Sequence, residues 1–230
     1  ARAALFSLFV AVVCLAAPRG ALAGLPLDAT TRDYDQLHLI IKVTPDIPAG
    51  TVDGEVTVRF APRGGPLSVL RLHSLETAVL AATDAAGRAL PFALADGILS
   101  ISLAEPLPVG TETAVTVRYR STPTAGLFFH APTKASPSTP LEMYSQGEGR
   151  ENRRWFPCYD ESDDRTTCEV FVTVPPGLRS VGNGVLVERK ALDGGRTTDH
   201  WRLDHRIPSY LISLVVGTFE TVTDTWRDVP

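Results

Sequence analysis

The chain contains little cysteine, and the placement of its cysteines excludes several kinds of site. Three cysteines occur in 230 residues. Cys14 follows the bulky Val13 inside an apolar stretch, which disfavours a lipoprotein. Cys158 and Cys168 are too few for a disulfide framework, and no C-x-x-C pair indicates a zinc or redox site. Their spacing would allow a hairpin-like bridge in an exported protein, but we favour two buried free thiols.

Basic runs and zinc-binding histidine pairs are absent as well. The net charge is −4, and no cluster of Lys and Arg suggests contact with nucleic acid or an anionic membrane. None of the five histidines forms a His-Glu-x-x-His motif, in which two imidazoles on one helix face bind zinc. The sequence therefore predicts no metal site in this chain and no nucleic-acid partner.

The first residues have the features of a secretory signal. Arg2 supplies a minimal positive charge, residues 3–17 form an apolar stretch, and Ala21-Leu22-Ala23 offers an A-x-A cleavage site. The apolar stretch is shorter than the roughly 20 residues that a transmembrane helix needs, and Pro18-Arg19-Gly20 interrupts it. We expect residues 1–23 to be a signal peptide, with no membrane span, and the mature protein to be secreted or periplasmic.

No convincing helical period follows the signal, whereas short runs of alternating polar and apolar residues are frequent. The first two runs look like a hairpin around residues 45–50. Asn183-Gly184 and Asp193-Gly194-Gly195 have the residue types of tight hairpin turns, and the proline-containing segment 131–140 looks like a loop. The sequence predicts one all-β domain over residues 24–230, a large and mostly antiparallel β-sandwich. Its predicted strands cover 37–43, 51–60, 67–72, 78–82, 98–103, 114–119, 169–174, 185–190, 198–203 and 210–216.

The segment Tyr144-Ser145-Gln146-Gly147-Glu148 holds the candidate binding residues. If it is a strand, alternation places Gln146 and Glu148 on one face. A carboxylate beside an amide suits an ammonium group, because charge-assisted hydrogen bonds are the stronger kind. Gly147 between them leaves room for a ligand or a second backbone. The alternative is the polar outer face of an ordinary strand, and the segment by itself favours that alternative.

An ordered set of motifs changes this balance. The motifs are Asp33-Tyr34-Asp35-Gln36-Leu37-His38-Leu39, Gly54-Glu55-Val56-Thr57-Val58, Thr124-Ala125-Gly126-Leu127-Phe128-Phe129, Ser145-Gln146-Gly147-Glu148, Pro157-Cys158-Tyr159-Asp160, Val181-Gly182-Asn183-Gly184 and Pro208-Ser209-Tyr210-Leu211-Ile212-Ser213-Leu214-Val215-Val216-Gly217-Thr218-Phe219-Glu220. In this order the chain resembles the amino-terminal domain of the aminopeptidase N family of zinc metallopeptidases, a saddle-like β-sandwich, over about residues 33–224. The resemblance implies that Gln146 helps line the pocket for the substrate's first residue and that Glu148 binds its α-amino group.

The resemblance also implies what lies outside this chain. In this family the zinc ligands and the Gly-x-Met-Glu-Asn exopeptidase motif belong to a later catalytic domain. Zinc is therefore expected in that missing domain and not here, and the chain is expected to be inactive without it. The implied partners are a peptide amino terminus and the protein's own catalytic domain, for which this domain should present an apolar face. The alternative is a non-catalytic binding or scaffolding protein of the same family.

The motif that follows Glu148 is expected to be structural. Asp160 is predicted to pair with Arg153 or Arg154, and no base lies near Cys158 in sequence that would make it a nucleophile. The chain departs from the family pattern at Asn152, where alanine is common, and at Ser162, where proline is common. Both departures concern the geometry of the local loop.

Overall fold

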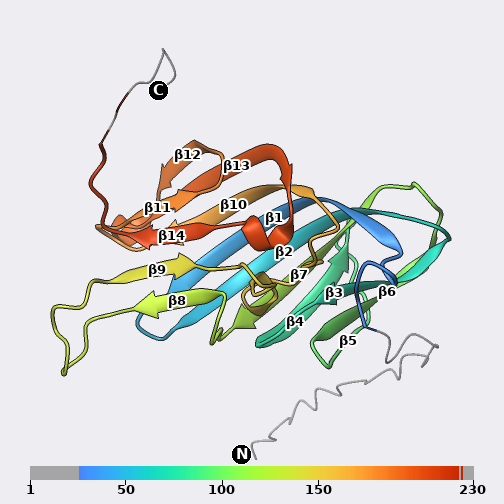
Figure 1. The fold of residues 1–230 in the computed structure, drawn as a ribbon, viewed down its shortest axis with the longest axis horizontal. Coiled ribbons are helices and arrows are strands. Elements are labelled where there is room, and N and C mark those ends of the chain that lie inside the picture. The colour runs from blue at the N-terminus through green and yellow to red at the C-terminus, as the bar shows by residue number, and fades with distance from the viewer. Residues whose placement is uncertain (1–25, 223, 225–230) are drawn as a thin grey trace, which may run out of the picture.

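The computed structural model describes residues 26–222 and residue 224, which form fourteen strands and three short 3₁₀ helices (Figure 1). The strands belong to three sheets, of seven, four and three strands. The predicted all-β, mostly antiparallel sandwich is therefore confirmed. The predicted signal peptide lies outside the described residues. None of the described helices has the length and hydropathy of a membrane span.

The seven-stranded sheet is the base of the molecule. Its strands follow the order β12-β13-β10-β1-β2-β7-β4. The pair β1 and β10 is parallel, and the other neighbours are antiparallel. These strands are β1 (Tyr34–Asp46), β2 (Thr51–Pro62), β4 (Thr77–Asp84), β7 (Thr113–Ser121), β10 (Thr166–Val174), β12 (Val185–Ala191) and β13 (Thr197–Ile207).

The two smaller sheets lie at opposite ends of this base (Figure 1). The four-stranded sheet has the order β11-β14-β9-β8, and the three-stranded sheet has the order β3-β6-β5. Their strands are β3 (Leu67–His73), β5 (Phe92–Ala95), β6 (Ile98–Leu107), β8 (Leu127–His130), β9 (Glu142–Ser145), β11 (Arg179–Gly182) and β14 (Leu214–Gly217). The 3₁₀ helices are η1 (Asn152–Arg154), η2 (Asp193–Gly195) and η3 (Ser209–Leu211).

One hydrophobic core joins the three sheets. It forms because buried and outward-facing side chains alternate along the strands. In β10 the side chains of Cys168, Val170 and Val172 are buried, while Glu169 and Phe171 between them face outward. The same core includes residues of all three sheets. Each small sheet thus buries one face against the base and leaves its other face outward.

Most predicted turns and strands occur as expected. The strands β1 and β2 form the predicted first hairpin, and η2 at Asp193-Gly194-Gly195 joins the antiparallel pair β12 and β13. Cys158 and Cys168 are buried free thiols, as predicted.

Two predictions of local structure are wrong. Asn183-Gly184 does not close a hairpin, because β11 pairs with β14 and β12 pairs with β13 in a different sheet. The segment 210–216 is not one strand, because it begins inside η3 and becomes extended in a sheet only at Leu214. Both differences from the predicted structure arise from contacts with residues that are distant in the sequence.

Candidate functional site

Strand β9 ends earlier than the alternating pattern predicts. Gln146 lies just past the strand and Glu148 lies in a turn, so the prediction of one strand over 144–148 is wrong. The turn closes through a 3.0 Å hydrogen bond from the Glu151 amide to the Gly147 carbonyl. Positive φ angles at Gly149 and Arg150 then reverse the chain. Both Gln146 and Glu148 nevertheless have exposed side chains.

Because Gly147 has no side chain, this turn can pack directly against η3. A Cβ atom at this position would lie 2.4 Å from the Tyr210 carbonyl oxygen and 2.4 Å from Asn152 Oδ1. Such distances are far below van der Waals contact, so only glycine allows the two backbones to approach this closely. Glu148 is therefore positioned next to Tyr210 by a direct backbone contact.

Asn152 fixes the same junction from inside. Its side chain is fully buried, and Nδ2 donates to the carbonyls of Ser209 at 2.7 Å and Ile212 at 2.8 Å. Its Oδ1 accepts a hydrogen bond from Trp155 Nε1 at 2.8 Å. Asparagine at this position is thus a connector between η1 and η3, and it gives the loop a defined geometry.

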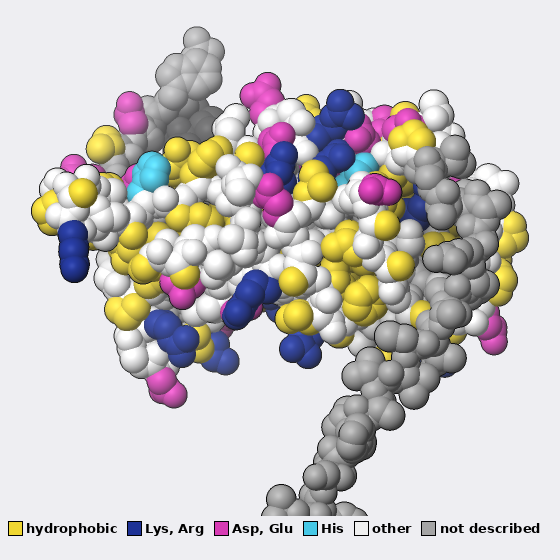
Figure 2. All heavy atoms as spheres, turned by 90° about the horizontal axis from the view of Figure 1, so that it is seen from below, with side chains coloured by type: hydrophobic (Ala, Val, Ile, Leu, Met, Phe, Trp, Pro, Cys, Tyr) yellow, Lys and Arg dark blue, Asp and Glu magenta, His cyan; other side chains and the backbone are white. Residues whose placement is uncertain are grey.

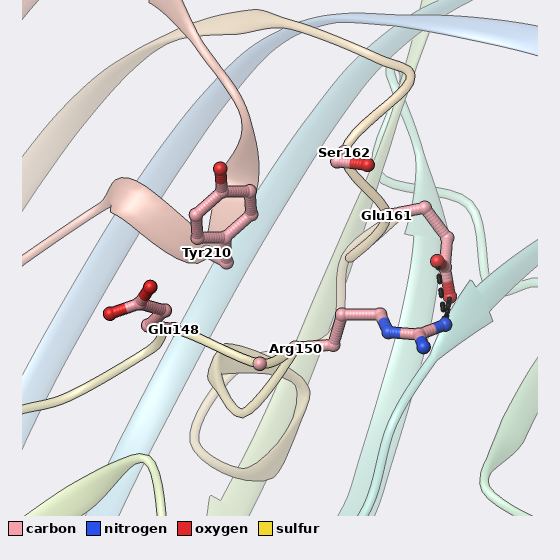
Figure 3. Close-up of a pocket in the computed structure, with 6 residues that line it drawn as sticks. Glu148, Arg150, Glu161, Ser162 and Tyr210 are labelled. Atoms are coloured by element: carbon pink, nitrogen blue, oxygen red, sulfur yellow. Dashed lines mark hydrogen bonds and ion pairs between the residues drawn. The ribbon is translucent and has the colours of Figure 1, made fainter.

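The turn and η3 form one wall of an open pocket of about 390 Å³. Figure 3 shows Glu148 and Tyr210 on one side of it, and Arg150 and Glu161 joined to each other on the opposite side. The lining residues come from three separate segments of the chain. They are Glu148, Gly149, Arg150, Glu161, Ser162 and Tyr210.

The charges around the pocket are paired with one exception. Glu161 accepts from Arg150 Nη1 at 2.9 Å and from Arg153 Nη2 at 3.0 Å, so two guanidinium groups compensate its charge. Among the described residues, none forms a hydrogen bond or ion pair with the Glu148 carboxylate. Its negative charge is therefore available to a cationic group that enters the pocket.

A buried polar layer supports this wall. Asp160 Oδ2 accepts from the Arg153 amide at 3.0 Å and from Arg153 Nε at 3.4 Å, which confirms the predicted pairing for Arg153. Arg154 instead pairs with Glu76 and Glu151. Burial raises the pKa of Asp160 above its usual range.

His73 is a neutral member of the same layer. Its Nδ1 accepts from the Asp160 amide at 3.0 Å, which leaves Nε2–H to donate to the Leu27 carbonyl at 2.8 Å. Burial lowers the pKa of His73 to about 3. Burial also raises the pKa of the Cys158 thiol well above its ordinary value, which disfavours the thiolate that a nucleophile would need.

The structure brings together residues that sequence reasoning did not connect. Of the two predicted candidates, Glu148 lies in the turn and Gln146 lies just before it, outside the residues that line the pocket. The sequence does not predict that Glu148 has Arg150, Glu161 and Tyr210 as neighbours. Glu161 and Tyr210 belong to separate segments of the chain, and Arg150 turns toward Glu161 through the turn. In the sequence, the family motif around Tyr210 is the only sign that this residue matters, and the motif does not show that Tyr210 lies beside Glu148.

The described residues do not provide a metal site. No group of three or more His, Cys, Asp or Glu side chains among them is arranged to hold a metal ion.

The comparisons with known proteins agree with the fold. The family model described as "Peptidase M1 N-terminal domain" matches residues 30–211. The chain therefore belongs to the M1 family of peptidases, the aminopeptidase N family, as its amino-terminal domain. It is 27% identical over 127 residues to aminopeptidase B of Mus musculus, covering 55% of this chain and 19% of that protein. It is 26% identical over 206 residues to aminopeptidase M1-D of Oryza sativa subsp. japonica, covering 87% of this chain and 23% of that protein.

A solved structure shows the same fold. The chain matches a mutant M1 zinc metallopeptidase from Deinococcus radiodurans bound to a Tyr-Ser-Ala substrate, with a TM-score of 0.70 and 25% identity. The match covers 81% of this chain and 43% of that one. The chain thus spans about a fifth of the length of these curated relatives and less than half of the solved enzyme.

Proposed function

We propose that this chain is the substrate-positioning, amino-terminal domain of an exported zinc aminopeptidase that removes amino-terminal residues from peptides. In this proposal Glu148 binds the α-ammonium group of the substrate. Gln146, which lies just before the turn and is not among the six residues that line the pocket described above, helps to line the part of the site that takes the substrate's first residue. The observation that carries the proposal is the exposed Glu148 carboxylate, which no described residue neutralises although the other charges of its pocket are paired. The M1 relatives named as aminopeptidases support the choice of substrate.

The turn that carries Glu148 is suited to positioning. Gly147 and Asn152 lock it to η3 through backbone contacts and buried hydrogen bonds, so the carboxylate has a fixed origin. A turn whose backbone is held in place before the substrate arrives loses little backbone freedom on binding. When a second domain covers the pocket and excludes water, the attraction between ammonium and carboxylate strengthens.

The role of this domain is to set the distance between the peptide's amino end and the point of cleavage. A free α-amino group anchored at Glu148 admits only the first peptide bond to the reacting groups, which is the property of an aminopeptidase. Misplacement by about 1 Å can cost on the order of a hundredfold in rate. We assign zinc and cleavage to the catalytic domain, and propose that the described domain alone does not hydrolyse peptides.

The proposed location is the periplasm or the extracellular space. It is supported by the amino-terminal segment, in which Arg2, an apolar stretch and Ala21-Leu22-Ala23 follow the order of a cleavable signal. Detection of mature protein beginning at Gly24 in the exported fraction would test this part.

The test of the proposed function uses the full-length enzyme and Glu148→Gln, which keeps the shape and removes the charge. We expect kcat/KM for an aminoacyl anilide with a free amine to fall on the order of 10- to 100-fold, because a charge-assisted hydrogen bond is worth about 1.5–3 kcal/mol. Glu188→Gln is the matched control, since Glu188 is an exposed carboxylate on β12, in a different sheet. Equal activity of the Glu148 variant and the control would refute the proposal.

A further inference from the structure

The connection between β8 and β9 is longer than a hairpin needs. It covers residues 131–141, whereas hairpin loops ordinarily have about 2–5 residues. These residues contain no helix or strand. Figure 1 shows the connection extending past the ends of both strands at the edge of the molecule. Pairing of β8 with β9 does not require this length, and long irregular connections often carry a function of their own.

Three prolines keep this loop from continuing the sheet. Pro132, Pro137 and Pro140 have no backbone N–H to donate to a neighbouring strand. The amides of Thr133 and Ser136 each donate to the other residue's carbonyl at 3.2 Å, which closes a local turn. The loop is therefore held outward by its own sequence and turn.

The loop presents hydroxyl side chains to solvent. Ser136 and Ser138 are exposed, and Thr139 is partly exposed. Among the residues that the structure describes, none forms a hydrogen bond with these three hydroxyl groups. Thr133 differs, because its Oγ1 accepts from the Ser136 amide at 3.0 Å. Three hydroxyl groups are thus accessible to an enzyme that modifies serine and threonine.

The same loop lacks the anchors of a protein interface. Its apolar residues are alanine, proline and Leu141, and its one charged residue is Lys134, whereas interface anchors are most often Trp, Tyr or Arg. The projecting end at the left of Figure 2 is largely white, the class that contains Ser, Thr and backbone, with scattered hydrophobic groups. Serine and threonine among prolines are the composition of segments that carry O-linked sugars.

The loop is also separated from the proposed peptide site. Strand β9 is antiparallel to β8, so the loop joins it at Glu142, while the Glu148 turn follows Ser145 at the other end. A group attached to the loop therefore leaves the Glu148 pocket open.

We propose that Ser136, Ser138 and Thr139 are attachment sites for O-linked sugars. The inference rests on the proposed location, since it takes the sugar donor to be a lipid-linked sugar phosphate met during export. The attached sugar shields the exposed peptide bond after Lys134, because exposed loops are the preferred sites of proteolytic cleavage.

The transfer is a substitution at the sugar. The hydroxyl oxygen forms a bond to the anomeric carbon of the donor, and the bond from that carbon to the phosphate oxygen breaks. The hydroxyl proton passes to a base of the transferase, and the lipid phosphate leaves with the bonding electrons. Nothing is oxidised or reduced.

The test is a mass analysis of the full-length protein purified from the exported fraction of its natural source. After denaturation, trypsin releases residues 135–150, which contain all three proposed sites. Residues 64–71 are the matched control, since their Ser68 is exposed but lies on β3 with no neighbouring serine or threonine. We expect fragment 135–150 to be heavier by whole sugar residues, located on the three sites by fragmentation, and fragment 64–71 to be unmodified.

An unmodified fragment 135–150 would overturn the inference, and so would a phosphate there or a sugar on Ser145 alone. The amino terminus of the same sample tests the location separately. An exported protein that begins at Gly24 and has an unmodified loop would refute the sugar sites and retain the proposed location, whereas protein confined to the cytoplasm would overturn both.

A variant with Ser136→Ala, Ser138→Ala and Thr139→Val together tests the role of the sugar. Produced in the same source, it should lose the added mass. Trypsin should also cut the native variant after Lys134 several-fold faster than the native parent protein. Equal rates of cleavage would overturn the shielding of this bond.

Discussion

The Asn152 side-chain amide donates a 2.7 Å hydrogen bond to the Ser209 carbonyl, although 57 positions separate the two residues. This contact joins the turn after β9 to the segment before β14. The relative position of Glu148 and Tyr210 depends on it, because Tyr210 directly follows Ser209 and Glu148 directly follows Gly147, which packs against the Asn152 side chain. The buried Asn152 side chain therefore holds the two segments of the site together, although it is not among the residues that line the pocket.

Replacement of Asn152 by alanine should destabilise the domain strongly. The Asn152→Ala variant leaves two carbonyls and the Trp155 indole N–H without their partner, and each buried unpaired group costs about 1–3 kcal/mol. We expect the free energy of unfolding in urea to fall by about 3 kcal/mol. The partly exposed Asn183 provides the comparison, since water can replace its bonds in Asn183→Ala. Equal losses in the two variants would contradict the assigned role.

Gly147→Ala tests the close approach of the two backbones. The added methyl group would lie 2.4 Å from a backbone carbonyl, so the turn or η3 must move. We expect a loss of about 2–4 kcal/mol in stability, together with weaker binding at Glu148. Gly65→Ala is the control, because nothing lies within 4 Å of a Cβ atom there. The control should stay within about 0.5 kcal/mol of the parent protein.

The buried His73 should make stability depend on pH. Its pKa is about 3 in the folded domain and about 6.5 in an unfolded chain, so only the unfolded chain takes up this proton between those values. The free energy of unfolding should therefore fall as the pH falls from about 6.5, by at most about 1.4 kcal/mol per pH unit from this group.

His73→Asn isolates this contribution, since an amide can accept from the Asp160 amide and donate to the Leu27 carbonyl. Urea unfolding at pH 7 and pH 5 should show a smaller pH dependence in the variant than in the parent. The buried Asp160, whose raised pKa acts in the opposite direction, is present in both and cancels in the comparison. Identical pH dependence in the two proteins would show that the fold does not lower the pKa of His73.

The two buried thiols should be inert in the native protein. Burial raises the pKa of Cys168 to about 12 and that of Cys158 well above its ordinary value, so neither forms the reactive thiolate at neutral pH. Alkylation followed by peptide mass analysis should leave both unmodified in buffer and modify both in guanidinium chloride. A disulfide-linked peptide containing both residues would contradict the structure.

The sequence predicts the sheets well where one face of a strand is buried. Alternation along β10, with Cys168, Val170 and Val172 inward, is a local property that can be read without knowing the partner. The parallel pairing of β1 with β10 could not be predicted in this way. It joins His38 to Thr167 across most of the chain, and nothing in either strand specifies that neighbour.

Of the residues that line the candidate pocket, the sequence indicates only Glu148, and it does not predict the shape of the pocket. The pattern of Tyr144 to Glu148 alternates like a strand, but the Gly147 carbonyl bonds within a turn because η3 occupies the space where the strand would continue. The same tertiary contact explains why 210–216 begins as a 3₁₀ helix. The pairing of Glu161 with Arg150 and Arg153, which leaves Glu148 as the uncompensated charge, required the structure.

The most direct test of the central claim is a crystal structure of the full-length protein with an amino acid or short peptide bound. The account predicts that the ligand's α-amino nitrogen lies about 2.7–2.9 Å from a Glu148 carboxylate oxygen, the range of a charge-assisted hydrogen bond. It also predicts that Gln146 contacts the first residue of the ligand. A bound ligand whose amino group lies well beyond hydrogen-bonding distance from Glu148, while its peptide bond sits at the point of cleavage, would contradict it.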